Sequence, residues 1–188
     1  MRNFLQALKM LIIMTVFLGL LYPLVVYGLA QVIFPGNANG SLITYKGKIT
    51  GSALIGQQFA QTKYFHGRPS ACSYDAANSF ASNLGPMNDK LLDGAKTAAA
   101  AYRQENGLDG QCPVPADAVL MSGSGLDPDI TVANAQAQAG RVAQARKLSK
   151  QQVLDLITRN TVEKTGGLMG AQRINVLSLN IALDNGAL

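Results

Sequence analysis

The first 34 residues carry the strongest hydrophobic pattern in the chain. There is no charged residue between Lys9 and Lys46, and Met10–Phe34 is almost wholly apolar. At 1.5 Å rise per residue, a helix over this range would reach about 37 Å, enough for a hydrocarbon core about 30 Å thick. Pro23 removes one backbone donor and should kink such a helix, which membrane spans tolerate. The pattern predicts a membrane anchor at 10–34, and its small residues suited to helix packing are Gly19, Gly28 and Ala30.

A cleaved secretory signal is the alternative interpretation of the same segment. It has a basic start, an apolar run and a small-x-Ala site at Gly28-Leu29-Ala30. The apolar run continues through Val32-Ile33-Phe34, beyond that site, which favours a retained anchor. Because Arg2 and Lys9 precede the span and no charge follows it closely, the positive-inside rule places residues 1–9 in the cytoplasm and the remaining domain outside.

The polar and apolar positions after the span predict one domain of mixed α and β structure. Residues 35–50 carry Pro, Gly and Asn signals and indicate a linker or hairpin, and 51–188 is long enough for one α/β (α+β) domain. The apolar, glycine-bounded segment 51–65 is typical of a strand, and Val114, Val119 and Leu120 indicate another. The small polar residues of 72–88 predict an ordered loop.

Four segments of this domain show start signals typical of helices. The caps expected are Asn88 for a helix that ends at Asn106-Gly107, Thr131 for 132–146, Ser149 for 150–159, and Asn175 for the C-terminal helix. The strongest local signal is the capping box formed by Ser149 and Gln152, with Leu148 and Val153 as its hydrophobic staple.

Charge and composition exclude few functions but argue against nucleic-acid binding. The formal net charge is +5, and Arg2 and Lys9 supply two of these charges, which leaves +3 on the domain. No cluster of Lys and Arg with interleaved aromatic residues occurs in the sequence.

Catalytic and metal-binding patterns are missing from the sequence. His66 is the single histidine, within "YFHGRPSA" at 64–71, and a metal site normally needs three or four ligands. There is no GxSxG elbow, and Gly123-Ser124-Gly125 lacks the lysine of a phosphate loop, so it is better interpreted as a turn before a helix. We therefore expect neither catalytic residues nor a metal. The motif is interpreted as a packed or recognition segment, and its recognition residues are His66, Arg68, Pro69 and Ser70.

Two cysteines, Cys72 and Cys112, leave two alternatives open. An even number in an extracytoplasmic domain favours a disulfide, whereas their spacing alone also allows two unpaired thiols.

Taken in order, the motifs resemble one protein family. They are "YP" in the span, "ANGSLI" at 38–43, "GSALIGQQF" at 51–59, "YFHGRPSA" at 64–71, "SNLGPMNDKL" at 82–91, "VPADAVLMSGSGLDPDIT" at 114–131, "RVAQARKLS" at 141–149 and "INVLSLNIALD" at 174–184. This set resembles the C subunit of the Kdp-type potassium-transporting ATPase and covers nearly the whole chain.

The resemblance implies a single-pass accessory subunit in the bacterial inner membrane, without catalytic activity of its own. Its implied partners are a channel-like potassium-translocating subunit, a P-type ATPase subunit and a very small fourth subunit. The family is described as needed for assembly and as a catalytic chaperone that raises the affinity of the ATPase subunit for ATP. The resemblance implies no tightly bound cofactor, and it offers Gln57 or its neighbour Gln58 as a contact to ATP.

The charge rule and the nucleotide role of Gln57 conflict. The rule places Gln57 outside the cell, whereas ATP lies in the cytoplasm, and a side chain cannot reach across a bilayer. We therefore expect an indirect effect on ATP affinity, carried through partner helices, and a domain that covers the extracellular potassium entrance. The alternative is a regulatory subunit that contacts ATP directly through Gln57.

Overall fold

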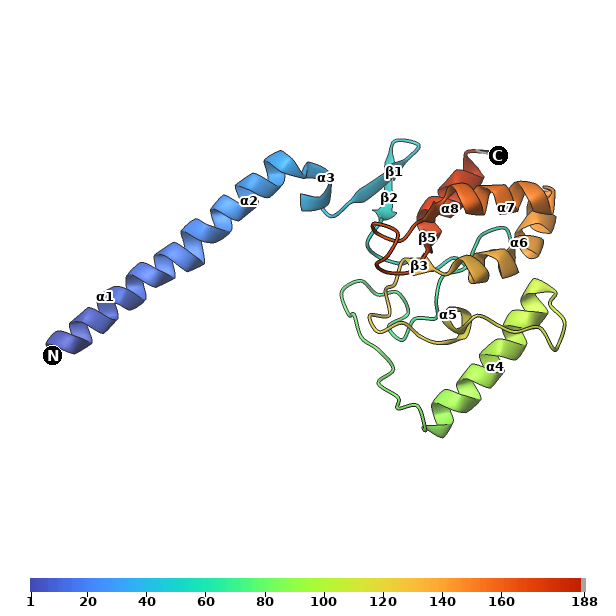
Figure 1. Cartoon of the computed structure of the whole chain (residues 1–188), viewed down its shortest axis with the longest axis horizontal. Coiled ribbons are helices and arrows are strands. Elements are labelled where there is room, and N and C mark those ends of the chain that lie inside the picture. Colours follow the sequence, from blue (N-terminus) through green and yellow to red (C-terminus); the bar gives the residue numbers. More distant parts are fainter. Residues whose placement is uncertain (187–188) are drawn as a thin grey trace. The chain divides into compact units, whose positions relative to one another are not determined.

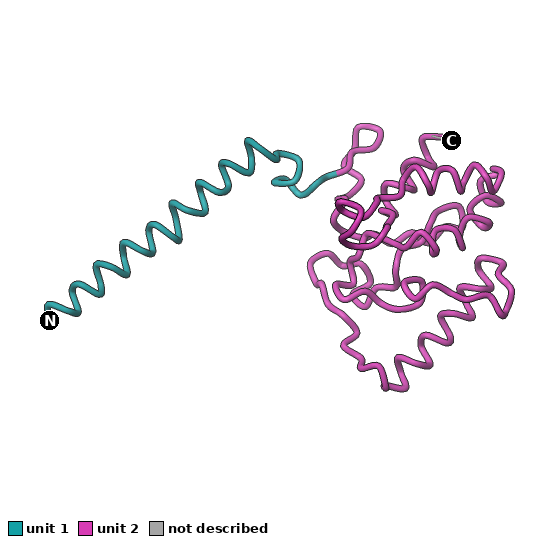
Figure 2. The backbone as a smooth tube through the Cα atoms, in the orientation of Figure 1, with its two compact units in different colours: residues 1–42 teal, residues 43–188 magenta. Residues whose placement is uncertain are grey.

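The computed structural model describes residues 1–186, and the chain divides into two compact units (Figure 2). The first unit comprises residues 1–42, and the second begins at Ile43.

The first unit is dominated by one long helical segment. It consists of α1 (Arg2–Val16), a π-helical turn η1 (Phe17–Leu21) and α2 (Tyr22–Ile33). These 32 residues are long and apolar enough to cross a membrane, and none of the most apolar stretch is buried within the protein. The predicted 10–34 segment thus corresponds to most of a longer helix that begins at Arg2 and ends at Ile33, one residue before Phe34.

Pro23 affects this helix through the turn that precedes it. The N–H of Tyr22 donates to the carbonyl of Phe17, five residues back, as expected of a π-helical turn. Because Pro23 has no N–H, the carbonyl one turn earlier loses its usual donor, and a π turn directly before the proline accommodates that loss.

The segment after the helix contains both a linker and a hairpin, the two alternatives predicted for residues 35–50. Phe34 leaves the helical region at φ −133° and ψ 56°, and α3 (Pro35–Ala38) adds one further turn. The strands β1 (Leu42–Tyr45) and β2 (Lys48–Ser52) then pair as a two-stranded hairpin. Its connection uses Lys46 and Gly47 at positive φ.

The second unit has an α+β fold with a small antiparallel sheet. The sheet contains β3 (Asp129–Ile130), β4 (Thr161–Val162) and β5 (Arg173–Asn175) in the order β3-β5-β4. Ile174 of the central strand faces Ile130 on one side and Thr161 on the other. The strand β5, which directly precedes the last helix, thereby joins β3 and β4, which are distant from each other in sequence.

Up to residue 186, five helices complete the unit, and Figure 1 shows their arrangement. They are α4 (Asp89–Asn106), α5 (Ala116–Val119), α6 (Val132–Arg146), α7 (Lys150–Arg159) and α8 (Val176–Asp184). All four predicted caps are confirmed, because the side chains of Asn88, Thr131, Ser149 and Asn175 each accept a backbone N–H in the first turn. The capping box at Ser149 is complete, and α4 ends at Gly107 in the left-handed conformation.

The core lies where α6, α7 and α8 meet the sheet. The helix α7 packs against both α6 and α8, while α4 contacts α5 and α6. Phe65, from the irregular segment 53–88, is fully buried in this core. Its main companions are Ile130, Ala135, Ala139, Val142, Val153, Leu156, Ile157, Ile174, Val176, Leu179 and Leu183.

Two strand predictions were wrong. The segment 51–65 is a strand only as far as Ser52, and beyond it Leu54 is 62% exposed. Side chains of α6 and α8 form hydrogen bonds with the backbone N–H and carbonyl groups at its C-terminal end, so that a partner strand is not needed there. Residues 116–119 form the helical turn α5, because Asp117 accepts hydrogen bonds from the N–H and Oγ1 of Thr131 and from Nδ2 of Asn134. These bonds hold the turn at the start of α6.

Candidate functional site

The motif at 64–71 is held in the domain through its backbone. The amide of Asn180 accepts from the N–H of Phe65 at 2.8 Å and donates to the carbonyl of the same residue at 3.0 Å. Gln138 does the same for His66, at 2.8 Å and 3.1 Å. The two amides come from different helices, α8 and α6, and each is at most 2% exposed. In an extended segment successive residues direct their backbone groups to opposite sides, so the two side chains together replace two neighbouring strands.

Two arginines of α6 hold the first residue of the motif and the two residues that precede it. Arg141 donates from Nη1 to the carbonyls of Thr62 and Tyr64, and from Nη2 to Gln138 at 2.8 Å. Arg146 donates from Nε to the carbonyl of Lys63 at 2.9 Å. The side chain of Arg141 is only 6% exposed, and these carbonyls compensate part of the cost of burying its charge.

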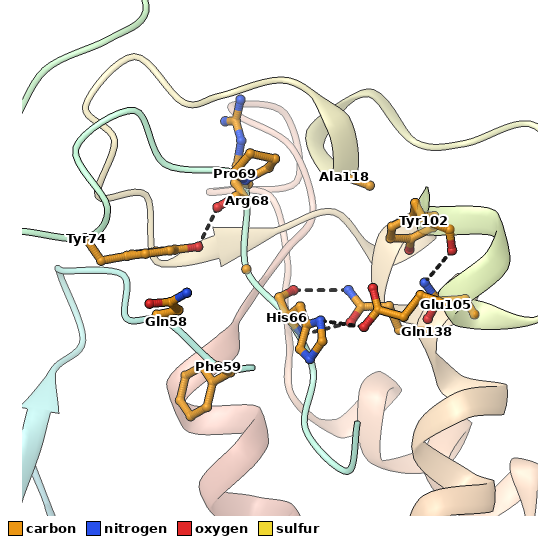
Figure 3. Close-up of a pocket in the computed structure, with 12 residues that line it drawn as sticks. Gln58, Phe59, His66, Arg68, Pro69, Tyr74, Tyr102, Glu105, Ala118 and Gln138 are labelled. Atoms are coloured by element: carbon orange, nitrogen blue, oxygen red, sulfur yellow. Dashed lines mark hydrogen bonds and ion pairs between the residues drawn. The ribbon is translucent and has the colours of Figure 1, made fainter. Parts of the chain in front are cut away.

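A cavity of about 240 Å³ lies beside the motif (Figure 3). Its walls are formed by the motif, by the helices α4, α5 and α6, and by the segments around Gln58 and Tyr74. The residues that line it are Gln58, Phe59, His66, Gly67, Arg68, Pro69, Tyr74, Tyr102, Glu105, Asn106, Ala118 and Gln138.

The His66 ring lies between two acceptors. Its Nδ1 is 3.0 Å from Oε1 of Glu105, and its Nε2 is 3.2 Å from the carbonyl of Gln61. Burial and the nearby charge of Arg141 lower the pKa of His66, and Gln61 and Glu105 oppose this effect. The neutral ring donates one proton and so satisfies one of the two acceptors at a time.

Arg68 joins the motif to the loop before β3. Its Nη1 is 2.8 Å from Oδ2 of Asp127, and both side chains are about three-tenths exposed. Its Nε is buried without a hydrogen-bond partner. The hydroxyl of Tyr74 donates to the carbonyl of Arg68, closing one wall of the cavity (Figure 3).

Pro69 and Ser70 continue the contact with the same loop. The hydroxyl of Ser70 donates to the carbonyl of Gly125 at 2.6 Å, and Ser122 donates its N–H to the carbonyl of Pro69 at 3.4 Å. The motif therefore packs along "SGSGLDPDI", which serves as a structural partner of 64–71.

The structure separates the two candidate glutamines. Nε2 of Gln57 donates to the carbonyl of Thr50 at 3.0 Å and lies against Gly51 of the β1–β2 hairpin. Gln58 is exposed and lines the cavity with His66. Only the second of the pair therefore shares a site with the motif.

The two cysteines are free thiols, so the structure does not form the disulfide that was one of the alternatives. Cys72 is buried against Ser70 and Gly125, whereas Cys112 lies in the loop after α4, where its carbonyl accepts from Arg103. Among residues 1–186, no group of three or more His, Cys, Asp or Glu side chains is arranged to hold a metal ion.

In the first unit, the two glycines suited to helix packing lie on an open surface, whereas Ala30 is partly buried. A Cβ atom added to Gly19 or Gly28 would meet no heavy atom within 4 Å. Met10, Pro23 and Phe34 lie on the same helix or at its end and are likewise exposed.

The most informative residues of the site were missed in the sequence. These are Gln138, Asn180 and Arg141, which place the motif, and Glu105, which lines the cavity together with Gln138. A signal was present, because Gln138 falls at the buried i, i+3 and i+4 spacing of Ala135, Ala139 and Val142. A polar residue within an apolar stripe needs a buried partner.

Comparison with known proteins extends over almost the whole chain. The family model described as "K+-transporting ATPase, c chain" matches residues 4–185. A potassium-transporting ATPase KdpC subunit of Mycobacterium tuberculosis (strain H37Rv) is 52% identical over 185 residues, covering 97% of this chain and 98% of the relative. The KdpC subunit of Caulobacter vibrioides (strain NA1000 / CB15N) is 55% identical over 174 residues, covering 90% and 86%. That of Koribacter versatilis is 46% identical over 186 residues, covering 97% and 94%.

Proposed function

Because the chain belongs to the KdpC family of the K+-transporting ATPase, we propose that it is a non-catalytic subunit anchored in the inner membrane by its N-terminal helix. Residues 1–9 lie in the cytoplasm and the domain that begins at Ile43 lies outside. The domain recognises the channel-like potassium-translocating subunit and covers its extracellular entrance. Through this contact it stabilises the assembly with the P-type ATPase subunit and the small fourth subunit.

The observation that carries this proposal is that the backbone of the 64–71 motif is held rigidly while its side chains face a cavity. Its backbone is fixed by Asn180 and Gln138, while the side chains of His66 and Arg68 line a cavity. Hydrolytic sites commonly use a nucleophile with its base or a metal with three ligands, whereas His66 faces Glu105 and the Gln61 carbonyl. This geometry suits a rigid surface that accepts a side chain of a partner.

The size of the cavity argues against direct binding of ATP. Pockets for small molecules and cofactors usually measure about 300–1,000 Å³, and this one measures about 240 Å³. Its one arginine, Arg68, is already paired with Asp127 at 2.8 Å, so its charge is partly compensated. Gln57, the residue of the direct ATP alternative, is bonded to the β1–β2 hairpin.

An effect on ATP affinity then follows from linkage between sites. A subunit that binds one conformation of the pump more tightly than another shifts the population toward that conformation. ATP affinity changes if the ATPase subunit binds nucleotide better in the favoured state. This route requires no contact between the domain and the nucleotide.

The test is a paired measurement on His66→Ala and Arg68→Ala, with Arg159→Ala as the matched control at an exposed arginine of α7. The amount of complex recovered by co-purification and the ATPase turnover per assembled complex are measured for each. We expect less complex, or a weaker apparent potassium affinity, for both motif variants, with turnover within a few-fold of wild type. A motif variant that assembles fully but has no turnover would overturn the non-catalytic role.

A further inference from the structure

The loop between β4 and β5, residues 163–172, presents two large apolar side chains to solvent. Leu168 is 89% exposed and Met169 is 69% exposed. We call these two residues the apolar tip. Single exposed apolar residues are common on protein surfaces, but two adjacent ones at the end of a hairpin form a projecting apolar surface.

The loop has a defined conformation that displays the apolar tip. Thr165 and Met169 form an antiparallel bridge, and the side chain of Gln172 donates to both carboxylate oxygens of Glu163 at 2.9–3.0 Å. Gly166, Gly167 and Gly170 adopt positive φ values of 63°, 76° and 83°, which other residues rarely adopt. Three such glycines around Leu168 and Met169 give a tight turn with the two side chains at its end.

The apolar tip belongs to the part of the unit where the chain enters from the helix. Asn175, at the end of β5, donates to the carbonyl of Ala53 at 2.9 Å, and Gly51 lies against Leu177. The hairpin β1–β2, which begins the unit, is thus packed beside β5 and the start of α8. In Figure 1 the red loop before β5 lies on the side of the unit that carries β2.

The connection to the helix is short. Ile33 ends α2 and Ile43 begins the second unit, and ten residues span at most about 35 Å when fully extended. With the helix seated in a bilayer, this tether would hold Ile43 within about 35 Å of the end of the helix. Under such tethering a contact that is weak in free solution becomes effective, because the local concentration of the membrane is high.

We propose that the apolar tip inserts into the interface of the lipid bilayer and orients the domain on the membrane. Leu168 and Met169 enter the boundary between headgroups and acyl chains, and Lys164 at the base of the loop lies near anionic headgroups. The inference rests on the proposed membrane anchor. It adds a second membrane contact, made by the folded domain itself.

The sequence contains no tryptophan, so one introduced tryptophan is a unique fluorescent probe. Leu168→Trp is compared with Met87→Trp, a matched control at a loop residue that is also 89% exposed. Each full-length variant is reconstituted alone into vesicles of phosphatidylcholine and phosphatidylglycerol, with and without bromine on the acyl chains. Flotation with the vesicles is measured first, because failure to float would reject the membrane anchor independently of the tip.

In floated protein we expect brominated acyl chains to quench the fluorescence of the Leu168→Trp variant at least two-fold, with a blue-shifted emission. The fluorescence of the Met87→Trp control should stay unchanged. Adding Leu168→Asp and Met169→Asp to a chain labelled near the tip, by Ala171→Trp, should abolish the quenching there.

Two outcomes would overturn the inference. One is equal, solvent-like emission from the Leu168→Trp and Met87→Trp variants. The other is shielding of the Leu168→Trp probe that requires the other pump subunits, which would assign the tip to a protein contact.

Discussion

The side-chain amide of Gln138 makes both hydrogen bonds of the His66 backbone, accepting from its N–H at 2.8 Å and donating to its carbonyl at 3.1 Å. It also accepts from Arg141 at 2.8 Å, so one side chain joins the motif to the buried arginine. The position of the His66 ring beside Glu105 depends on this arrangement. The motif is therefore placed by helix side chains, and not by a β-ladder.

Gln138→Met should destabilise the folded domain. The change keeps the size of the side chain but leaves the backbone groups of His66 and one guanidinium nitrogen of Arg141 unpaired, at a cost of roughly 2–4 kcal/mol. The loss of stability is measured as a shift of the denaturant midpoint of the detergent-solubilised protein, with susceptibility to proteolysis as the readout of unfolding. Gln144→Met on the exposed face of the same helix should change stability by less than about 0.5 kcal/mol. Equal effects of the two changes would contradict the role given to Gln138.

Gly56→Ala should disturb the contact between the "GSALIGQQF" segment and the loop before β3. A Cβ atom at this position would lie 2.5 Å from the backbone carbonyl of Asp127, and the N–H of Gly56 donates to Leu126 at 2.8 Å. Because backbone must move to relieve the clash, we expect a loss of about 1–3 kcal/mol. Gly85→Ala, where a Cβ meets nothing within 4 Å, serves as the control and should be nearly neutral. A neutral result at Gly56 would show that the two loops separate easily.

The stability of the domain should depend on the protonation of His66. Burial and Arg141 lower its pKa in the folded protein below the ordinary value of 6.5, so the folded state binds this proton more weakly than the unfolded chain does. The contribution of the neutral ring is fully present above about pH 6.5 and is lost as the pH falls from there through the folded-state pKa. Unfolding midpoints of wild type and His66→Gln between about pH 7.5 and 5 test this. The difference between them should shrink toward acid, and a difference that grows toward acid would contradict the stated direction.

The two glycines of the long helix should matter for assembly. A Cβ at Gly19 or Gly28 meets nothing in this chain, so these positions are open for close approach of a partner helix. Replacing both with Leu should reduce co-purification with the large pump subunits several-fold. Gly36→Leu, placed after the helix ends at Ile33, should have little effect. Unchanged recovery of the double variant would mean that the helix acts only as an anchor.

Local signals in the sequence predicted most helix boundaries but not the irregular segments. Caps such as Ser149 with Gln152 act within one turn, so neighbouring residues suffice to recognise them. The segment 51–65 resembles a strand because of its apolar residues, yet Phe65 reaches the core from a loop whose hydrogen bonds come from Asn180, 115 residues away. No short sequence window contains that pairing.

The candidate site was predicted in part for the same reason. "YFHGRPSA" stood out because it holds the single histidine, and the structure places His66 and Arg68 at one cavity. Glu105 could not be assigned to it, since an exposed acidic residue near the end of a helix has many alternative roles. Gln57 and Gln58 are adjacent in sequence, and only the packing of Gln57 on Gly51 separates them.

The proposed function requires that the domain after the helix lies outside the cytoplasm. The most direct test fuses alkaline phosphatase, which is active only after export, or a green fluorescent protein that fluoresces only in the cytoplasm, after Leu188 of the full chain in cells that also express the other subunits. We predict high phosphatase activity and no fluorescence, with the reverse pattern for fusions placed before the helix. Fluorescence without phosphatase activity at the C-terminus would place the domain on the same side as ATP and overturn the proposed topology.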